Sequence, residues 1–266
     1  MSRIGRAFAA APGGKAFIPF ITAGDPTLDV TEELVVAMAG AGADLIELGI
    51  PFSDPTAEGP VIQAANLRAL RNKVTTDDVF AMVGRVRRKS DVPLVIMTYA
   101  NVVYSYGIER FAARQAELGM GGVILPDVPH EEKEEFDKPF YAAGLDVVSL
   151  IAPTSHERIR AIAHDARGFV YCVSSLGVTG VRSKITTNIG AMVRLVKEER
   201  PDLPCAVGFG ISTPEQAASM ASVSDGAIVG SAIVRMIGEL GEACMDPVCD
   251  YVRNMADAVH NVSQRS

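Results

Sequence analysis

Several residue patterns that mark particular classes of protein are missing from this sequence. The four cysteines show no Cys-x-x-Cys spacing, and the four histidines are scattered singly. Neither set indicates a zinc site or a disulfide framework, so we expect no metal and reduced thiols in a cytoplasmic protein. The residues concerned are Cys172, Cys205, Cys244, Cys249, His130, His156, His164 and His260.

Long hydrophobic runs and a basic face are also lacking. No stretch reaches ~18 consecutive apolar residues, so we expect neither a membrane span nor a secretory signal. The net charge is −7, and the densest positive cluster, Arg85–Lys89, closes an expected helix, where cations complement the helix dipole. Because binding to nucleic acid needs a basic face, we expect no nucleic-acid partner.

The sequence instead alternates short apolar runs with longer segments of helical period. The runs are almost continuously hydrophobic, as are parallel strands buried on both faces. They are Ala16–Thr22, Asp44–Leu48, Leu94–Thr98, Gly122–Pro126, Asp146–Ile151, Phe169–Val173, Pro204–Val207 and Ala227–Val229. The helical segments are Leu28–Ala41, Thr76–Lys89, Ile108–Leu118, Glu131–Ala143, Glu157–Asp165, Ile189–Glu199 and Pro214–Met220.

Eight β/α units with short connections favour a closed (β/α)8 TIM barrel that forms a single domain over residues 1–266. On periodicity alone, a doubly wound open sheet is the alternative. Two segments fall outside the repeat. Arg3–Ala10 is expected to form an extra helix that covers the bottom of the barrel. Pro51–Leu70 is an unusually long connection after the second strand, and such connections are often functional.

The active site of such a barrel lies at the carboxyl ends of its strands. Glu47 falls inside the apolar second strand, where a carboxylate is costly unless it is paired or lines a cavity. It is either part of a salt bridge in the barrel core or a general acid/base whose pKa is raised by desolvation. Asp54 and Glu58 follow on the long connection, and acid/base sites often use two carboxylates in different environments.

Glycines mark the loops after the last three strands. Gly208–Ser212 follows the seventh strand, and Gly230-Ser231 precedes a short helix after the eighth. Backbone amides exposed at these glycines, together with a helix N-terminus directed at the gap between the two loops, predict a phosphate site. Residues 174–183 form a glycine-containing loop that could close as a lid. Three aromatic residues near strand ends suit either the core or a flat substrate; they are Phe20, Tyr99 and Tyr171.

Taken together, these segments resemble the tryptophan synthase alpha subunit family. The block ELGIPFSDPTAEGPVIQ (Glu47–Gln63) is similar to the family's signature, and the other matching segments stand in family order over nearly the whole chain. They are PFITAGDP, YAN, PDVP, GVTG, GFGIS and GSAIV. The resemblance implies retro-aldol cleavage of indole-3-glycerol phosphate to indole and glyceraldehyde 3-phosphate, without a metal or an organic cofactor.

The resemblance also implies roles for individual residues. Glu47 matches the catalytic acid/base, which protonates indole C3 and takes the proton of the adjacent glycerol hydroxyl. Glu58 stands where the family has an aspartate that holds the indole N–H, so the carboxylate is kept and its side chain is one methylene longer. The residues that match the indole glycerol site are Phe20, Tyr99, Ile151, Tyr171 and Thr179. Those that match the phosphate site are Gly180, Gly210, Gly230 and Ser231, with a lid over residues 175–190.

A partner is implied as well. The family works with a pyridoxal-phosphate beta subunit in an alpha2-beta2 tetramer, and the loops with Asp54, Asn101 and Pro129 match its docking face. Pyridoxal phosphate itself is not expected to bind this chain. Two alternatives stay open: a stand-alone lyase or another phosphate-barrel isomerase, and a module that docks on the beta subunit while its own activity has weakened. Only Glu58 motivates the second.

Overall fold

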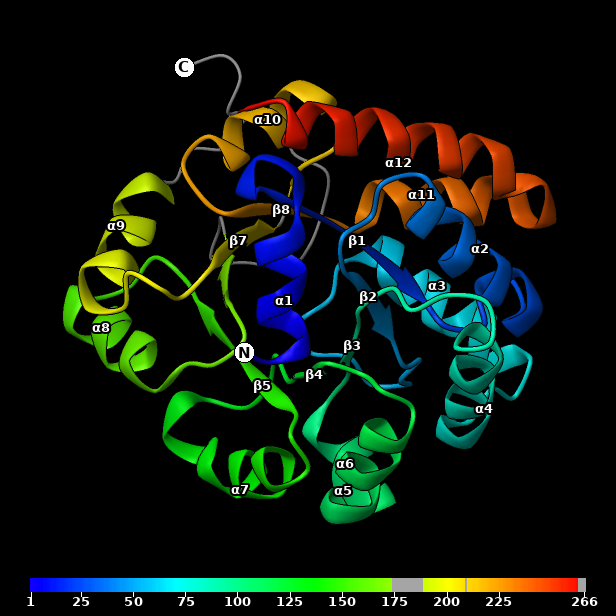
Figure 1. Ribbon diagram of the computed structural model, residues 1–266. Helices are drawn as coiled ribbons and strands as arrows, with labels where there is room; N and C mark the ends of the chain where they lie inside the picture. Colours follow the sequence, from blue (N-terminus) through cyan, green and yellow to red (C-terminus); the bar gives the residue numbers. More distant parts are fainter. Residues whose placement is uncertain (174–188, 209, 263–266) are drawn as a thin grey trace.

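The computed structural model describes residues 1–173, 189–208 and 210–262. Its eight parallel strands form a closed barrel in sequence order, and the last strand pairs with the first (Figure 1). This closure confirms the barrel and excludes the open sheet. The strands are β1 (Ala16–Thr22), β2 (Ile46–Gly49), β3 (Leu94–Met97), β4 (Gly122–Ile124), β5 (Asp146–Ile151), β6 (Val170–Val173), β7 (Cys205–Gly208) and β8 (Gly226–Val229).

Helices surround the barrel, as Figure 1 shows. The first half of the chain forms α1 (Arg3–Ala10), η1 (Pro12–Gly14), α2 (Leu28–Gly40), α3 (Pro60–Arg71), α4 (Thr76–Val86), α5 (Ala100–Tyr106) and α6 (Ile108–Glu117). The second half forms η2 (His130–Glu132), α7 (Glu134–Ala142), α8 (His156–Asp165), α9 (Ile189–Glu199), α10 (Pro214–Ala221), α11 (Ser231–Leu240), η3 (Gly241–Cys244) and α12 (Met245–His260). No helix in these ranges is long and apolar enough to cross a membrane.

The connection expected over residues 51–70 is mostly helical, which corrects that prediction. Helix α3 begins at Pro60, whose ring fixes a helical φ at the first position, after Gly59 in extended conformation. Its buried residues Ile62, Ala65, Asn66 and Ala69 follow helical spacing. Irregular structure is therefore confined to residues 50–59, and α3 becomes a wall of the site.

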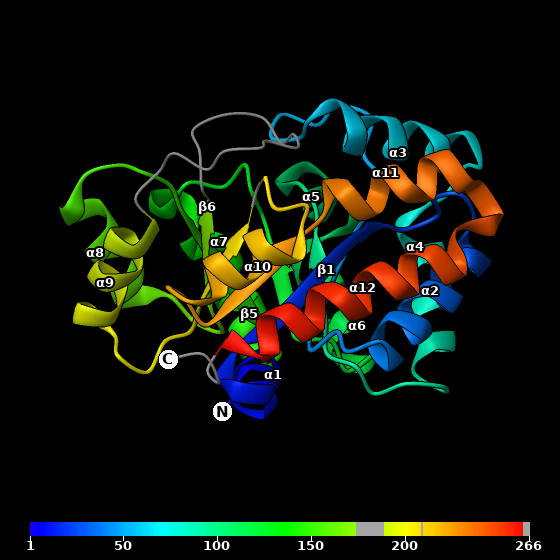
Figure 2. The ribbon, with the colours of Figure 1, turned by 90° about the horizontal axis from the view of Figure 1, so that it is seen from above.

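The barrel interior is filled by one residue from each strand or from the position just before it. This cluster holds Ile18, Leu45, Val95, Ile124, Val148, Phe169, Ala206 and Ile228. Ile4 and Phe8 of α1 join it, and the rings of Phe8 and Phe169 lie 5.4 Å apart. Helix α1 therefore closes one end of the barrel, and Figure 2 shows α3 towards the opposite end. Side chains two residues further along each strand point inward near that second end.

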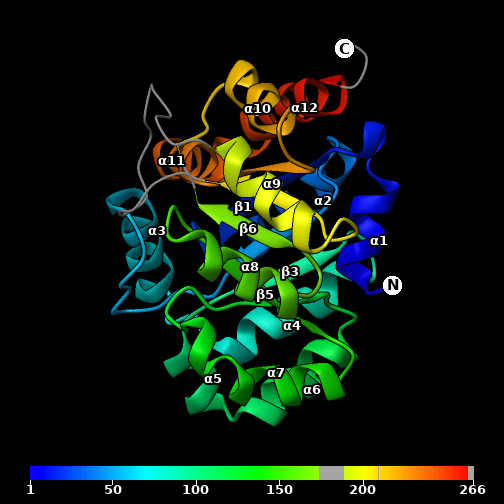
Figure 3. The ribbon, with the colours of Figure 1, turned by 90° about the vertical axis from the view of Figure 1, so that its left-hand side faces the viewer.

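The helices pack on the outer face of the barrel in two apolar clusters. The larger one joins β1–β4 to α2, α4, α6, α7 and α12, and the smaller one joins β5–β7 to α8 and α9. Figure 3 shows α8 and α9 side by side, and they pack on each other. Reciprocal capping boxes, Thr75 with Asp78 and Thr213 with Gln216, begin α4 and α10.

Candidate active site

The centre of the candidate site is Glu47, which points into the barrel. It lies two residues after the interior residue Leu45 and pairs in register with Phe20 on one side and Val95 on the other. Its side chain is 1% exposed, and within the described ranges neither carboxylate oxygen has a hydrogen-bond partner. Burial raises the pKa of Glu47 to about 8. The salt bridge that we considered for this residue is therefore not formed with any described residue.

Tyr171 and Phe20 lie close to this carboxyl group. Burial raises the pKa of the Tyr171 hydroxyl well above its usual value, and the nearby charge of Glu47 raises it further. A Cβ atom at Gly208 would overlap the Tyr171 ring, and one at Gly49 would lie 2.8 Å from Cζ of Phe20. Glycine at these positions therefore makes room for the two rings, so that both stand beside Glu47.

Glu58 forms the second acidic position, at the start of α3. Its carboxylate is partly buried and accepts a hydrogen bond from Nδ2 of Asn66 at 2.6 Å. Burial raises the pKa of Glu58, while hydrogen bonds with Asn66 and Tyr99 oppose that rise. The two carboxyl groups thus differ in environment: one has no partner in the described ranges, and the other is held by an amide. Such a difference separates the tasks of acid and orienting base.

Tyr99 connects the end of β3 to the loop that carries Glu58. It is 3% exposed, and its hydroxyl accepts a hydrogen bond from the Ala57 N–H at 3.2 Å. The ring lies 5.2 Å from that of Phe52. Gln63 donates to the Glu58 carbonyl at 2.8 Å. The loop before α3 is therefore held from two directions, by β3 and by its own helix.

The phosphate positions lie where β7 and β8 end. Gly230 precedes α11 and has no side chain to cap it, so among the described residues the first amides of α11 are available to a ligand. Ser231 is the first residue of the helix. Gly210 has φ +78°, in the left-handed region that favours glycine. The strands β7 and β8 are neighbours, so both loops border one gap.

Not every predicted residue falls in this group. Ile151 belongs to the apolar cluster on the outer face of β5, with Ile159 and Cys172, whereas Leu150 packs with the barrel interior. The structure thus does not bring Ile151 together with Glu47. Thr179, Gly180 and most of the predicted lid lie outside the described residues.

Sequence reasoning missed several residues that border the site. Asn66, Ile62 and Met97 lie against Glu58 or Phe20, and Ile62 with Phe20 and Val234 forms a small apolar cluster. Thr22 is 1% exposed, and its hydroxyl has no hydrogen-bond partner in the described part of the chain. The helix-start signal Gly59-Pro60 could have indicated them, because it places Ile62 and Asn66 in a helix that follows the second strand.

The predicted docking residues are exposed at the same end of the barrel. Asp54 and Pro129 lie in the loops after β2 and β4, whereas Asn101, expected in a loop, is the second residue of α5, which follows β3; the three strands are neighbours. The Ala100 N–H donates to the Asp127 carboxylate at 3.1 Å, which links the start of α5 to the loop after β4. Beside Asn101 is a cavity of about 400 Å³, bordered by Phe52, Thr75 and Tyr106 among others. The described residues contain no group of three potential metal ligands.

Comparison with known proteins gives one consistent family. The family model described as "Tryptophan synthase alpha chain" matches residues 7–260. The tryptophan synthase alpha chain of Caldanaerobacter subterraneus subsp. tengcongensis is 47% identical, covering 97% of this chain and 100% of that protein. That of Lacticaseibacillus casei is 45% identical over 94% of both chains. A crystal structure of the alpha subunit from Legionella pneumophila superposes with a TM-score of 0.88 at 38% identity, covering 98% and 99% of the two chains.

Proposed function

The chain belongs to the tryptophan synthase alpha chain family, and from this membership we propose that Glu47 is the acid/base of its reaction. As the alpha component of tryptophan synthase, the protein cleaves indole-3-glycerol phosphate to indole and glyceraldehyde 3-phosphate. The observation that carries the proposal is a carboxyl group buried at the inner face of the barrel, without a partner among the described residues and with its pKa raised to about 8.

A retro-aldol cleavage needs one proton added and one removed. Protonation of indole C3 makes the ring an electron acceptor, and the hydroxyl on the carbon next to C3 loses its proton as that carbon becomes the aldehyde. The electrons of the broken C–C bond return to the ring. Glu47 fits both transfers because, with a pKa of about 8, it is mostly protonated at neutral pH and becomes a base after donating.

Glu58 is proposed to bind the indole N–H while positive charge develops on the ring. A carboxylate in a partly buried site stabilises such charge more strongly than one in water. The hydrogen bond from Asn66 fixes the longer Glu side chain, which supports the role despite the additional methylene. The aromatic rings of Phe20, Tyr99 and Tyr171 are proposed to border the indole glycerol group.

The phosphate group is proposed to bind at Gly210, Gly230 and Ser231, together with Gly180. The uncapped start of α11 supports this position, since backbone amides and the helix dipole attract anions. Thr179 is proposed to contact Glu47 when the lid closes. Ile151 remains a prediction that the outward packing of its side chain does not support.

Membership of this family implies a beta-subunit partner. We propose that Asp54, Asn101 and Pro129 lie in the contact and that the assembly is an alpha2-beta2 tetramer. They are exposed and lie just after three neighbouring strands, which supports a common docking face. We also propose that the chain is a single domain and works in the cytoplasm; its four unpaired cysteines are in keeping with a reducing compartment.

The variant Glu47→Gln tests the proposal. Removal of the acid/base is expected to lower the rate of indole release by a factor of about 10² or more. Binding of glycerol 3-phosphate, measured by calorimetry, is expected to survive because the phosphate position is untouched. Turnover near the unsubstituted level would remove Glu47 from the chemical step, and loss of ligand binding would show that the substitution had damaged the site more widely.

A further inference from the structure

A second cavity lies outside the barrel, on the other side of its wall from Glu47. It measures about 510 Å³ and lies between η2 and α8, beside the end of β4 and along β5. Its floor includes Ser149, whose neighbours Val148 and Leu150 pack with the barrel interior. Because neighbouring residues of a strand face opposite ways, Ser149 points outward into this space. The cavity is therefore separate from the catalytic position.

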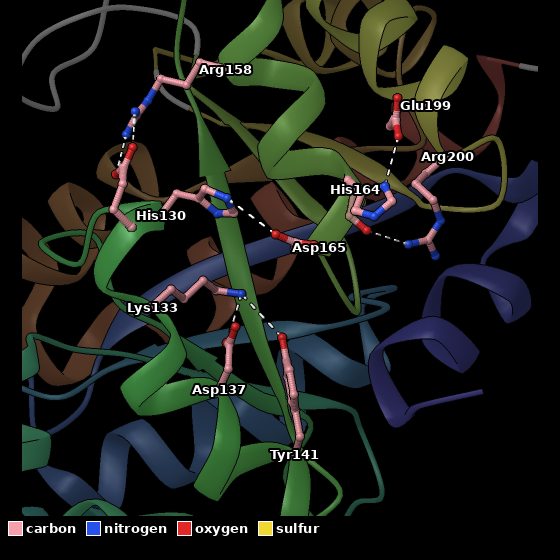
Figure 4. A network of polar contacts seen from close by, with 10 residues as sticks. His130, Lys133, Asp137, Tyr141, Arg158, His164, Asp165, Glu199 and Arg200 are labelled. Carbon is pink, nitrogen blue, oxygen red and sulfur yellow. Dashed lines mark hydrogen bonds and ion pairs between the residues drawn. The ribbon is translucent and has the colours of Figure 1, made fainter.

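The cavity occupies a break in the outer apolar layer. Phe136 and Phe140 of α7 belong to the larger cluster, whereas Ile159 and Ile162 of α8 belong to the smaller one. Polar side chains span the gap between the two helices, as Figure 4 shows. Arg158 forms a bidentate ion pair with Glu131, and Nε2 of His130 lies 3.5 Å from the Asp165 carboxylate.

The polar lining favours an anion. The charged residues on the cavity wall are two cations, Arg158 and Lys133, and one carboxylate, Asp127. The Asp127 carboxylate is engaged by the Ala100 N–H at 3.1 Å. Lys133 is 7% exposed and has Asp137 at 3.1 Å, with the Tyr141 hydroxyl at 3.5 Å (Figure 4).

Ser149 supplies a second indication of a ligand. The residue is 5% exposed, and within the described ranges nothing forms a hydrogen bond with its hydroxyl. A buried hydroxyl normally has a partner, so one facing a cavity is a donor in want of an acceptor. The remaining walls are apolar and include Leu125, Val147 and Ile162.

We propose that this cavity binds a small monocarboxylate with a compact apolar body, of the aryl carboxylate class. Arg158 would take the carboxylate in bidentate geometry. Its present pair with Glu131 is exposed, with side chains 43% and 58% accessible, and exposed pairs contribute little, so the guanidinium can exchange partners. Ser149 would donate a hydrogen bond to the same carboxylate, and the apolar walls would enclose the ring. A pocket of this size matches the small-ligand range.

Titration of the full chain with benzoate, followed by calorimetry or methyl NMR, tests the proposal. Benzamide, which keeps the shape and removes the charge, is the comparison ligand. Two variants probe the cavity, Arg158→Met and Ser149→Val, and Arg160→Met on α8 is the matched control for Arg158→Met. Arg158→Met removes the cation at the cavity, and Arg160→Met removes an arginine of similar exposure that pairs instead with Glu198 at 2.8 Å, away from the cavity. Ser149→Val replaces the unpaired hydroxyl with methyl groups.

The expected result is saturable benzoate binding. It weakens about tenfold or more in Arg158→Met, because a charge-assisted hydrogen bond is lost. Ser149→Val is expected to weaken it several-fold, while Arg160→Met and Glu47→Gln bind as the unsubstituted chain does. Equal binding of benzamide, equal losses in both arginine variants, or displacement of benzoate by indole-3-glycerol phosphate would overturn the proposal. The last outcome would place benzoate in the catalytic site and leave the proposed lyase function intact.

Discussion

Glu47 shows how a functional residue is kept at the expense of stability. An ionised carboxylate buried without a partner is disfavoured, so the folded protein binds a proton that the unfolded chain releases. In this protein the pKa of the folded state is about 8, above the usual value of 4.5. The surrounding rings of Phe20 and Tyr171 exclude water that would otherwise restore the ordinary pKa. The burial that supports the proposed role of Glu47 as an acid is therefore also a source of instability.

This cost has a measurable dependence on pH. Below pH 4.5 Glu47 is protonated in both the folded and the unfolded state, so it has little effect on the free energy of unfolding. As the pH rises from about 4.5 towards 8, Glu47 ionises first in the unfolded state, and the folded state loses stability. Glu47→Gln is thus expected to be more stable than the unsubstituted chain at pH 7, by on the order of 3 kcal/mol, and similar to it near pH 4. Urea unfolding at both pH values measures this, and a difference independent of pH would contradict the raised pKa.

Substitution of Glu58 tests whether the second carboxylate is catalytically active. Its Oε2 accepts from Asn66 at 2.6 Å, a contact that a shorter aspartate cannot reach without a shift of the loop. We therefore expect Glu58→Asp to lower kcat, by about tenfold, with Asn66→Ala giving a similar loss because both release the carboxylate. Steady-state indole release measures it. A marked rise in turnover for Glu58→Asp would instead favour the docking module whose own chemistry has weakened.

At the scale of elements, the N-terminus of α11 carries the phosphate proposal. Gly230→Asp places a carboxylate where the anion is expected, so the Michaelis constant should rise by at least about tenfold through like-charge repulsion. A Cβ at this position also approaches Phe20 at 3.2 Å, so Gly230→Ala is the control that separates crowding from charge. An unchanged Michaelis constant for the aspartate variant would mean that the phosphate binds elsewhere.

The strands and most helices could be predicted because their signals are local. Continuous apolar runs gave the bounds of β1 and β5, and the N-terminal helix Arg3–Ala10 follows its expected limits. Helix α3 was not predicted, because residues 51–70 were interpreted as one long connection although Gly59-Pro60 is typical of a helix start. Its importance comes from tertiary contacts, such as Asn66 with Glu58, that span several residues of irregular chain.

The same distinction applies to the candidate site. Glu47 could be found because a charge inside an apolar strand is unusual in the sequence itself. The packing of Phe20 against Gly49 and Gly230 joins three strands and depends on barrel closure, which no local pattern records. Ile151 illustrates the reverse case, since a shift of one residue along β5 moves a side chain from the interior to the outer layer.

For the whole molecule, the two ends of the barrel have different tasks. Helix α1 closes one end, where Ile4 and Phe8 pack on the barrel interior. The opposite end holds both carboxyl groups and the uncapped α11, with the exposed loops after β2, β3 and β4 beside them. The proposed docking face therefore adjoins the loop that carries Glu58. Binding of the beta subunit beside that loop is expected to increase turnover.

Indole release from indole-3-glycerol phosphate, with and without a beta subunit, tests the central claim most directly. The expected result is slow release by the chain alone and a rise of about tenfold or more on addition of the partner, because the proposed docking face adjoins the loop that positions Glu58. Fast release that the partner does not change would point to a stand-alone lyase. Absence of release in both conditions would contradict the assignment of Glu47 and Glu58 as a working catalytic pair.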